Sequence, residues 1–288
     1  MKDVKGRVAV VTGAASGMGL AFSHKFAEEG MNVVLADIES EPLAMAEAAL
    51  KEKGGEVLAV RTDVMTEDDV NRLADAAFSR FGNVHIVCNN AGVAASAATL
   101  RSRPWESSIA DWEWTFGVNF MGVLYGIRAF VPRMLENGEE GHIVNTASMA
   151  GLLTGANPYN ISKHSVVCLT EGIYKEFKGM GAKLSASVLC PGLINTAILD
   201  SERNRPAEFG PPTDVSSLRP EVQEFSATFE AALKAGYEPE EVALQVFEAI
   251  RNDKFYIFPA QPGVLESVKL RMEDIIEQRN PSIPVAAR

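Results

Sequence analysis

The chain of 288 residues is poor in the side chains that form disulfides and metal sites, since it has only three cysteines and four histidines. Cys88, Cys168 and Cys190 are odd in number and far apart, so we expect reduced thiols rather than a disulfide framework. Neither the cysteines nor the histidines stand at the spacing of a metal site. The sequence therefore predicts no bound metal, and its thiols favour a cytoplasmic protein.

Long apolar runs and basic runs are also absent. No stretch of about 18 or more apolar residues is free of charge, so we expect no membrane span and no membrane partner. Residues 1–7 lead directly into a predicted strand and lack the apolar core of a signal peptide. The formal net charge is −11 and no basic cluster appears, so nucleic acid is not an expected partner.

Short apolar runs alternate with helical patterns along the whole chain. The apolar runs are rich in valine and continuous, which is typical of strands buried on both faces. Gly30 marks the end of the first helix, and residues 66–69 and 108–111 resemble capping boxes with aspartate in the reciprocal position. The alternation predicts an α/β fold, a Rossmann-like doubly wound seven-stranded parallel sheet with helices on both faces, as a single domain over residues 1–288. The strands are expected at 7–12, 31–37, 56–62, 84–90, 142–147, 183–190 and 255–259.

Residues 197–236 interrupt this alternation and are too many for a plain connection, so we expect a substrate lid here. The segment starts at the carboxyl end of a predicted strand, where ligands of open α/β sheets bind. The alternative is ordinary core or a contact between subunits. Four prolines lie in the segment: Pro206, Pro211, Pro212 and Pro220. Five apolar side chains recur at helical spacing and predict an amphipathic helix: Leu218, Val222, Phe225, Phe229 and Leu233.

Tyr159 and Lys163 stand four residues apart, so their side chains project from one face of a predicted helix. A phenol has a free pKa of about 10 and is too weak an acid to transfer protons readily at pH 7. A lysine charge about 4 Å away would lower that pKa by up to about 3 units. The pair therefore predicts a proton donor tuned by a neighbouring cation.

A glycine turn lies between the first predicted strand and the first helix. Gly13 allows the tight turn, Gly17 lets the backbone approach a pyrophosphate, and Gly19 permits close packing of helix on strand. Asp37 ends the second strand, where a carboxylate binds the adenosine ribose hydroxyls and repels a 2′-phosphate. Neither the turn nor Ile38 supplies a basic group, so NAD is predicted over NADP. A purely structural turn and a solvated Asp37 are the alternatives.

Further motifs follow in a fixed order. Asn-Asn-Ala-Gly at 89–92 follows the fourth strand, Asn119 lies in a long helix, and Asn-Thr-Ala-Ser at 145–148 ends the fifth strand. With the T-G-x-x-x-G-x-G turn, the Tyr-x-x-x-Lys pair and residues 191–196, the chain resembles the short-chain dehydrogenase/reductases over essentially its full length. The resemblance implies an NAD(H)-dependent oxidoreductase that interconverts a secondary alcohol and a ketone.

The resemblance also implies a role for each matching residue. Tyr159 is the general acid in reduction and the base in oxidation, and Lys163 lowers its pKa and holds the nicotinamide ribose. Ser148 hydrogen-bonds the substrate oxygen, and Asn119 supports a water-linked proton relay. The cofactor residues that it implies are Gly13, Ser16, Gly17, Met18, Gly19, Asp37, Asp63, Val64, Asn90, Ala91, Gly92, Tyr159, Lys163, Pro191, Gly192, Ile194 and Thr196.

The chain departs from the family pattern at three places. Ala147 replaces a common serine, His85 replaces a usual aspartate, and the spacing from Ser148 to Tyr159 is shorter than usual. The shorter loop bears on the mouth of the substrate pocket, not on the chemistry. The sugar-nucleotide epimerases of the family have a glycine turn one residue shorter, which argues against an epimerase.

The expected substrate is a bulky apolar or aromatic secondary alcohol or its ketone. Residues 130–134 and 201–206 resemble a subgroup that acts on bulky secondary alcohols, such as aryl alcohol dehydrogenases. A hydroxysteroid or terpenoid alcohol dehydrogenase is the alternative enzyme, and a non-catalytic NAD-binding sensor is the alternative from another class. The helices expected at 111–135 and 159–178 carry more apolar surface than one sheet face needs. Together with the resemblance, this predicts a homo-oligomer, a tetramer or a dimer.

Overall fold

Seven parallel strands form one central sheet in the computed structural model, which describes residues 1–52, 56–94, 99–101, 103–211, 216, 219–259 and 263–282. Their order, β3-β2-β1-β4-β5-β6-β7, confirms the predicted Rossmann-like doubly wound fold. Every predicted strand is present, displaced by at most two residues at either end. The bounds are β1 (Val8–Thr12), β2 (Asn32–Asp37), β3 (Val57–Arg61), β4 (Ile86–Asn89), β5 (Gly141–Thr146), β6 (Leu184–Leu189) and β7 (Tyr256–Ile257).

The strand order reverses between β1 and β4. From β1 the chain builds outward to β3, then returns to β4 on the other side of β1 and continues outward to β7. The hydroxyl oxygen of Thr12 accepts hydrogen bonds from the backbone N–H groups of Asn90 (2.9 Å) and Ala91 (3.0 Å). These bonds join the loops that follow β1 and β4, and in such sheets ligands bind in the crevice at this point.

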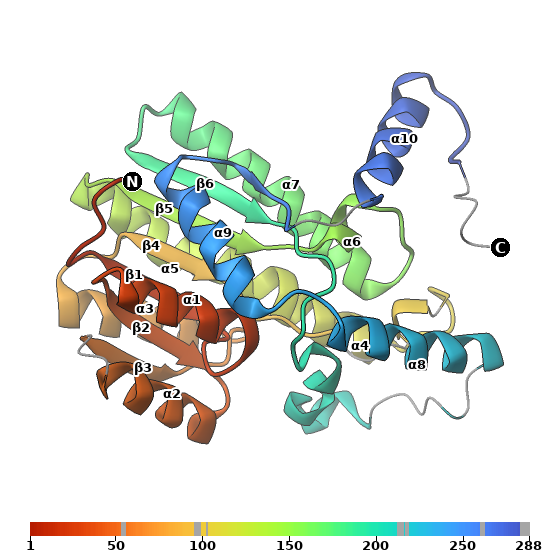
Figure 1. Ribbon diagram of the computed structural model, residues 1–288, viewed down its shortest axis with the longest axis horizontal. Coiled ribbons are helices and arrows are strands. Elements are labelled where there is room, and N and C mark those ends of the chain that lie inside the picture. Colours follow the sequence, from red (N-terminus) through yellow and green to blue (C-terminus); the bar gives the residue numbers. More distant parts are fainter. Residues whose placement is uncertain are drawn as a thin grey trace.

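Helices cover both faces of the sheet (Figure 1). On one face, α1 (Gly17–Glu28), α2 (Ser40–Glu52) and α9 (Pro239–Arg251) share one buried apolar cluster. On the other, α3 (Glu67–Phe81), α5 (Gly122–Asn137) and α7 (Pro158–Gly179) share a second. Further elements gather at the carboxyl ends of the strands: η1 (Thr99–Arg101), α4 (Ile109–Phe116), α6 (Met149–Leu152), η3 (Ile198–Asn204), η4 (Ala207–Phe209) and α8 (Pro220–Lys234).

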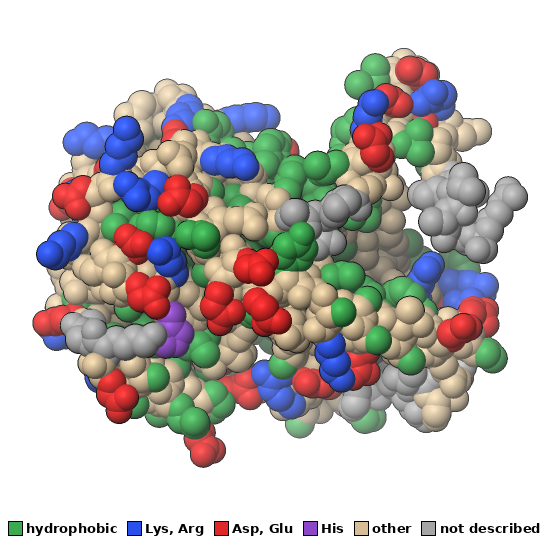
Figure 2. Space-filling view, in the orientation of Figure 1, with side chains coloured by type: hydrophobic (Ala, Val, Ile, Leu, Met, Phe, Trp, Pro, Cys, Tyr) green, Lys and Arg blue, Asp and Glu red, His purple; other side chains and the backbone are tan. Residues whose placement is uncertain are grey.

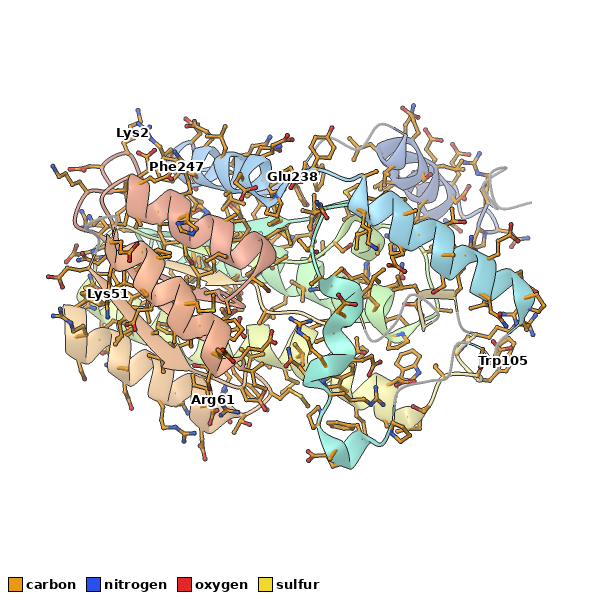
Figure 3. The ribbon with its side chains drawn as sticks, turned by 60° about the horizontal axis from the view of Figure 1, so that its bottom comes forward. Lys2, Lys51, Arg61, Trp105, Glu238 and Phe247 are labelled. Carbon is orange, nitrogen blue, oxygen red and sulfur yellow. The ribbon has the colours of Figure 1, made fainter. Side chains whose placement is uncertain are left out.

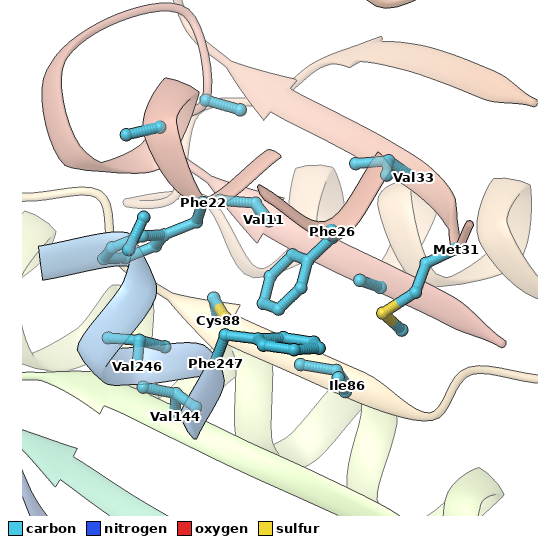
Figure 4. Packing of buried hydrophobic residues seen from close by; sticks show 14 of the residues in the cluster. Val11, Phe22, Phe26, Met31, Val33, Ile86, Cys88, Val144, Val246 and Phe247 are labelled. Atoms are coloured by element: carbon cyan, nitrogen blue, oxygen red, sulfur yellow. The ribbon is translucent and has the colours of Figure 1, made fainter. Parts of the chain in front are cut away.

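The larger core cluster lies under α1 and α9 (Figure 4). The rings of Phe26 and Phe247 meet at a centroid distance of 6.4 Å and an angle of 60°, above Ile86 of β4. Cys88 lies in the same cluster, and its burial raises the pKa of its thiol. Cys88 and Cys190 are buried thiols, as expected of small apolar residues, whereas the same expectation was wrong for Cys168, which is exposed.

Of the two predicted capping boxes, one is half formed and the other is wrong. The Ser108 hydroxyl accepts a hydrogen bond from the backbone N–H of Asp111 at 3.1 Å, but the Asp111 carboxylate pairs elsewhere. Thr66 makes no side-chain cap bond. The carboxylate of Asp69 instead accepts from the backbone N–H of Asp63 at 3.0 Å, so it braces the preceding loop.

The long helix predicted at 111–135 contains a π turn, η2 (Gly117–Met121), between α4 and α5. Asn119 lies in this turn and is fully buried. Its amide oxygen accepts from the backbone N–H of Val93, and its amide nitrogen donates to the carbonyl of the same residue, both at 2.9 Å. Single π turns are frequent at functional sites, where they redirect a side chain. Here the turn ties the helix to the loop after β4.

The first part of the predicted lid is anchored by a buried ion pair. Arg205 and Asp111 pair at 2.8 Å, with side chains that are 4% and 2% exposed. The Arg205 guanidinium lies over Trp114, 5.1 Å from the ring centroid, and donates to the carbonyls of Phe209 and Gly210 at 3.0 Å. This pair fastens η3 and η4 to α4.

Two helices project from the body at the carboxyl end of the sheet. Figure 1 shows α8 extending beyond the strands, and α10 (Val264–Ile276) standing off from the rest of the molecule. In the space-filling view α10 remains separate from the surface around it (Figure 2). None of the helices that the structure describes is long and apolar enough to cross a membrane.

The Arg205–Asp111 pair predicts a large effect on stability. Arg205→Met removes the guanidinium that pairs with the buried Asp111 carboxylate, so we expect the free energy of unfolding to fall by about 3–5 kcal/mol. Chemical denaturation measures this loss. The matched control is Arg219→Met, which breaks the more exposed pair with Glu106 (3.4 Å) and should lower stability by about 1 kcal/mol or less. Equal losses in the two variants would contradict the anchoring role.

Candidate active site

One cavity of 810 Å³ opens at the carboxyl ends of the strands and collects nearly all the residues that the sequence singled out. Of the predicted cofactor residues only Gly19 is outside its lining, and of the predicted catalytic residues only Asn119. The cavity extends from the ends of β1 and β2 to α8. The sequence motifs, scattered over nearly 190 positions, therefore meet in one place.

The glycine turn has the shape that its sequence predicts. Gly13 and Gly17 have positive φ angles of 66° and 52°, which favour glycine. A Cβ atom on Gly19 would lie 2.0 Å from the carbonyl oxygen of Gly13, so no larger residue fits between helix and turn. Ser16 makes no side-chain cap bond, which leaves the first N–H groups of α1 facing the cavity. Such a helix N-terminus fits the pyrophosphate of a dinucleotide.

Asp37 is buried at the end of β2 and both of its carboxylate oxygens are held by backbone N–H groups. Oδ2 accepts from Ala15 in the glycine turn at 2.9 Å, and Oδ1 accepts from Glu39 at 3.0 Å. An ionised carboxylate has about four lone-pair sites. Asp37 also lines the cavity, so it retains acceptor capacity for the hydroxyls of an adenosine ribose.

Gly92 brings the predicted relay residues together. A Cβ atom on Gly92 would lie 3.3 Å from both the amide oxygen of Asn119 and the ammonium nitrogen of Lys163. The amide nitrogen of Asn119 also donates to the Ser162 hydroxyl at 3.2 Å. The two polar groups thus flank one glycine of the Asn-Asn-Ala-Gly motif, and a side chain at this position would crowd both of them.

The start of α7 sets the positions of Tyr159 and Lys163. The Asn157 side chain accepts from the backbone N–H of Asn160 at 2.9 Å, so the helix begins at Pro158 and carries Tyr159 in its first turn. Lys163 follows one turn later on the same face, with its ammonium nitrogen 5.9 Å from the centroid of the Tyr159 ring.

Lys163 is 3% exposed and donates to the backbone carbonyl of Thr146 at 2.9 Å. Burial lowers the pKa of its ammonium group to about 8, because desolvation disfavours the charged form. Below that pH the side chain is charged, so at neutral pH a cation lies beside Tyr159.

The pKa of Tyr159 differs from the expected value. Burial raises it above its ordinary value, and a hydrogen bond with Ser148 acts in the opposite direction. We expected Lys163 to lower this pKa, but in the protein alone desolvation outweighs other effects. Tyr159 is therefore protonated at neutral pH.

Ser148 caps α6 and faces the cavity. Its hydroxyl oxygen accepts from the backbone N–H of Ala150 at 3.1 Å, and the hydroxyl lies 3.4 Å from the carbonyl oxygen of Pro191. Because α6 starts directly after this residue, the short connection to Tyr159 contains a helical turn. The spacing that is shorter than usual still leaves both side chains on the cavity wall.

The far half of the cavity is largely apolar. Phe225 and Phe229 of α8 stack with ring centroids 5.4 Å apart, and both line the cavity together with Leu233, as the helical spacing predicts. Leu218 and Pro212, also named from the sequence, lie outside the described residues. Arg101 of η1 lies over Phe225 at 4.7 Å and was not predicted.

A second contact that the sequence did not reveal crosses the cofactor half. Arg203 of η3 donates two hydrogen bonds to the Glu39 carboxylate, at 3.0 Å and 2.6 Å. The two residues are 164 positions apart and both line the cavity. No local pattern connects them, so only the fold brings them together.

Comparison with known proteins decides the family. The family profile described as short chain dehydrogenase matches residues 7–207. The chain belongs to the short-chain dehydrogenase/reductase family. A solved short-chain dehydrogenase/reductase from Burkholderia phymatum, in complex with NAD, is 44% identical, with 99% of each chain covered and a TM-score of 0.91.

Characterised relatives of this short-chain dehydrogenase/reductase are similar over most of its length. A 1-deoxy-11-beta-hydroxypentalenate dehydrogenase from Streptomyces exfoliatus is 37% identical, covering 88% of this chain and 82% of the relative. A 3beta-hydroxysteroid dehydrogenase 2 from Eggerthella lenta is 35% identical, covering 81% and 90%. With the NAD complex, these relatives confirm the prediction of an NAD-dependent enzyme that interconverts alcohols and ketones.

Proposed function

We propose that Tyr159, Ser148, Lys163 and Asn119 carry out this interconversion on a bulky, largely apolar secondary alcohol. The observation that carries the proposal is the shared cavity: Tyr159 and Ser148 lie on its wall between the glycine turn and the apolar side chains of α8. A substrate oxygen at this wall meets two hydroxyl groups while its apolar part faces Phe225 and its neighbours.

Each proposed role follows from the chemistry of the group. In reduction the carbonyl oxygen gains negative charge, so the Tyr159 phenol donates a proton to it and the Ser148 hydroxyl donates a hydrogen bond. In oxidation the proton moves in the opposite direction. Lys163 holds a positive charge beside the phenol, and Asn119 orients the loop after β4 around it. When bound, NAD(H) supplies or accepts the hydride.

The cofactor residues that we propose are those named from the sequence. The glycine turn would hold the pyrophosphate, Asp37 the adenosine ribose, Asp63 and Val64 the adenine, and Pro191 with its neighbours the nicotinamide. The positive φ angles at the turn and the two held oxygens of Asp37 support these places.

The bulky substrate is supported by the size of the cavity and by the relatives. Its volume of 810 Å³ lies near the upper end of the range of about 300–1,000 Å³ for small-molecule sites, and it must hold the cofactor too. The relatives are named for a hydroxypentalenate and a 3beta-hydroxysteroid. A hydroxysteroid or terpenoid alcohol therefore stays a candidate substrate beside an aryl alcohol.

Tyr159→Phe tests the proposed chemistry. The ring remains but its transferable proton is lost, so we expect kcat to fall about 10²–10⁴-fold while the Kd of NADH changes little. Tyr174→Phe, in the same helix but outside the cavity lining, is the control and should keep full activity. The measurement is turnover with a panel of secondary alcohols and NAD.

Two outcomes would count against the proposal. A Tyr159→Phe enzyme that keeps most of its kcat would remove the phenol from the reaction. A wild-type protein that binds NADH but turns over no alcohol in the panel would favour a non-catalytic NAD-binding sensor instead.

We further propose that the chain is one catalytic domain in which part of residues 197–236 forms a lid. The buried Arg205 anchor fixes η3 and η4, so the moving part is α8. Figure 1 shows that this helix projects beyond the sheet. Its aromatic side chains, Phe225 and Phe229, line the cavity. Closure would exclude water and strengthen the hydrogen bonds to the substrate oxygen.

Hydrogen exchange tests the lid. We expect the amides of α8 to exchange more slowly with NADH and a substrate-like ketone than with NADH alone, while the core helix α9 stays protected in both states. High protection of α8 without ligand, unchanged by it, would instead indicate a fixed subunit contact. As a companion test, Phe225→Ala should reduce kcat/KM for large alcohols more than for 2-propanol, because it removes an apolar wall.

We also propose a cytoplasmic homo-oligomer, a tetramer or a dimer. Ile109 near the start of α4 and Ile276 at the end of α10 are 71% and 77% exposed, and Ile161 on α7 is 37% exposed. Large exposed apolar side chains favour contacts between copies. All three cysteines are free thiols, the form that a reducing compartment maintains.

Light scattering at micromolar concentration measures the mass in solution. We expect a multiple of the 31.1 kDa chain mass, two or four copies, because the exposed apolar faces need a partner. A mass of one chain would contradict the oligomer. Cell fractionation checks the location. Absence of the protein from the cytosolic fraction would contradict the proposed cytoplasmic location.

A further inference from the structure

Glu39 and Arg203 form a two-point ion pair at the adenosine end of the cavity. The Nε and Nη2 atoms of Arg203 donate to the two carboxylate oxygens of Glu39, at 3.0 Å and 2.6 Å. The hydrogen bond from Arg203 holds the pKa of Glu39 below its usual value, and the pKa of Arg203 is raised in turn. The pair is therefore ionised on both sides at neutral pH.

The guanidinium of Arg203 is held by a third hydrogen bond as well. Its Nη1 atom donates to the backbone carbonyl of Asp200 at 2.9 Å, which holds the group from a third side. The negative charge of Asp37 contributes to the raised pKa of Arg203, so the two side chains are within electrostatic reach. In the view of Figure 3, the segment with η3 and η4 lies between α8 and the end of β3 that Arg61 marks.

The charges of Asp37, Glu39 and Arg203, at the adenosine end of the cavity, bear on which dinucleotide fits. We call these three side chains the corner. Asp37 and Glu39 each carry −1 and Arg203 carries +1, so the three sum to −1. A 2′-phosphate would meet a net negative corner, although a guanidinium matches its geometry better than any other side chain does. Arg203 supplies such a guanidinium, but its Nε and Nη2 atoms already donate hydrogen bonds to Glu39 and are not available to a phosphate.

We infer that Glu39 is a second determinant of cofactor choice, because it masks Arg203, an arginine that would otherwise bind the 2′-phosphate of NADP. The inference rests on the proposed place of the adenosine ribose at Asp37. The preference for NAD then has two causes. Asp37 repels a 2′-phosphate, and Glu39 occupies the arginine that would otherwise bind that phosphate. The other explanation is that the pair only fastens η3 to the loop after β2.

Isosteric substitutions separate the two causes. Asp37→Asn and Glu39→Gln remove one charge each, keep side-chain size, and together change the sum at the corner from −1 to +1. Asparagine also retains an oxygen that can accept from the glycine turn, as Asp37 does from Ala15. The readout is the Kd of NADH and of NADPH for the full-length protein, measured by titration of dihydronicotinamide fluorescence without any alcohol substrate.

The wild type should bind NADH and bind NADPH far more weakly. Adding Glu39→Gln to Asp37→Asn should tighten NADPH binding by about 10- to 100-fold, which is the range for hydrogen bonds to a charged group. Adding Arg203→Ala should abolish that gain, whereas in the wild-type background it should change the Kd of NADPH little. Arg203→Lys keeps the positive charge but loses the planar pair of N–H donors, so it should retain part of the gain in NADPH binding.

Arg80 provides the matched control. It also pairs with a glutamate, Glu56, at 2.6 Å, but beside the start of β3, at the end of the strands opposite to the cavity. Arg80→Ala in the doubly substituted protein removes the same charge and should leave the NADPH gain intact.

The results that would overturn the inference are distinct from those that would overturn the proposed function. An NADPH gain that persists without Arg203 would exclude the arginine as the phosphate ligand. Equal weakening of NADH and NADPH by Arg203→Ala in every background would assign the pair a fastening role only. A wild-type protein that binds neither dinucleotide would overturn the proposed cofactor site and this inference with it.

Discussion

The hydroxyl of Thr12 accepts hydrogen bonds from the backbone N–H groups of Asn90 and Ala91, and this contact joins the two strands at which the sheet reverses its order. On one side of it the chain builds the half that carries the glycine turn and Asp37. On the other it builds the half that carries Ser148 and the helix of Tyr159. Since all strands are parallel, both halves present their carboxyl ends to the same crevice. The topology of the sheet thus creates the crevice, and the side chains at the strand ends then line it.

Burial controls the chemistry within this crevice. Lys163 and Asn119 are almost wholly removed from solvent. Lys163 is held by the last carbonyl of β5, and Asn119 by the backbone of the loop after β4. Such fixed polar groups need no reorganisation when charge develops on a substrate oxygen. The same desolvation raises the pKa of Tyr159, so the phenol holds its proton at neutral pH. A buried cation thus lies beside a half-buried acid on the wall of the cavity.

Features set by local sequence were predictable, and those set by distant contacts were not. The strands, the positive φ angles of the glycine turn and the shared face of Tyr159 and Lys163 follow from neighbouring residues. The capping box at Thr66 failed because the Asp69 carboxylate, which was expected to accept from the backbone N–H of Thr66, accepts instead from Asp63 in the preceding loop. The π turn and the pairs of Arg203 and Arg205 depend on segments far apart in the chain. Sequence spacing carries no information about such contacts, nor about the desolvation that sets the pKa of Tyr159.

The hydrogen bond from Ala15 to Asp37 has a consequence for how this enzyme can change. The Asp37 carboxylate, which we propose distinguishes NAD from NADP, also braces the glycine turn that we propose holds the pyrophosphate. Recognition and support therefore share one side chain, and a substitution there alters the strength of binding together with its selectivity. The Glu39 carboxylate does not support the glycine turn in this way, since it pairs with Arg203 across the cavity. A change of preference from NAD to NADP during evolution would therefore disturb the structure less at Glu39 than at Asp37. Substitution of Glu39 can alter selectivity while the glycine turn keeps its hydrogen bond to Asp37.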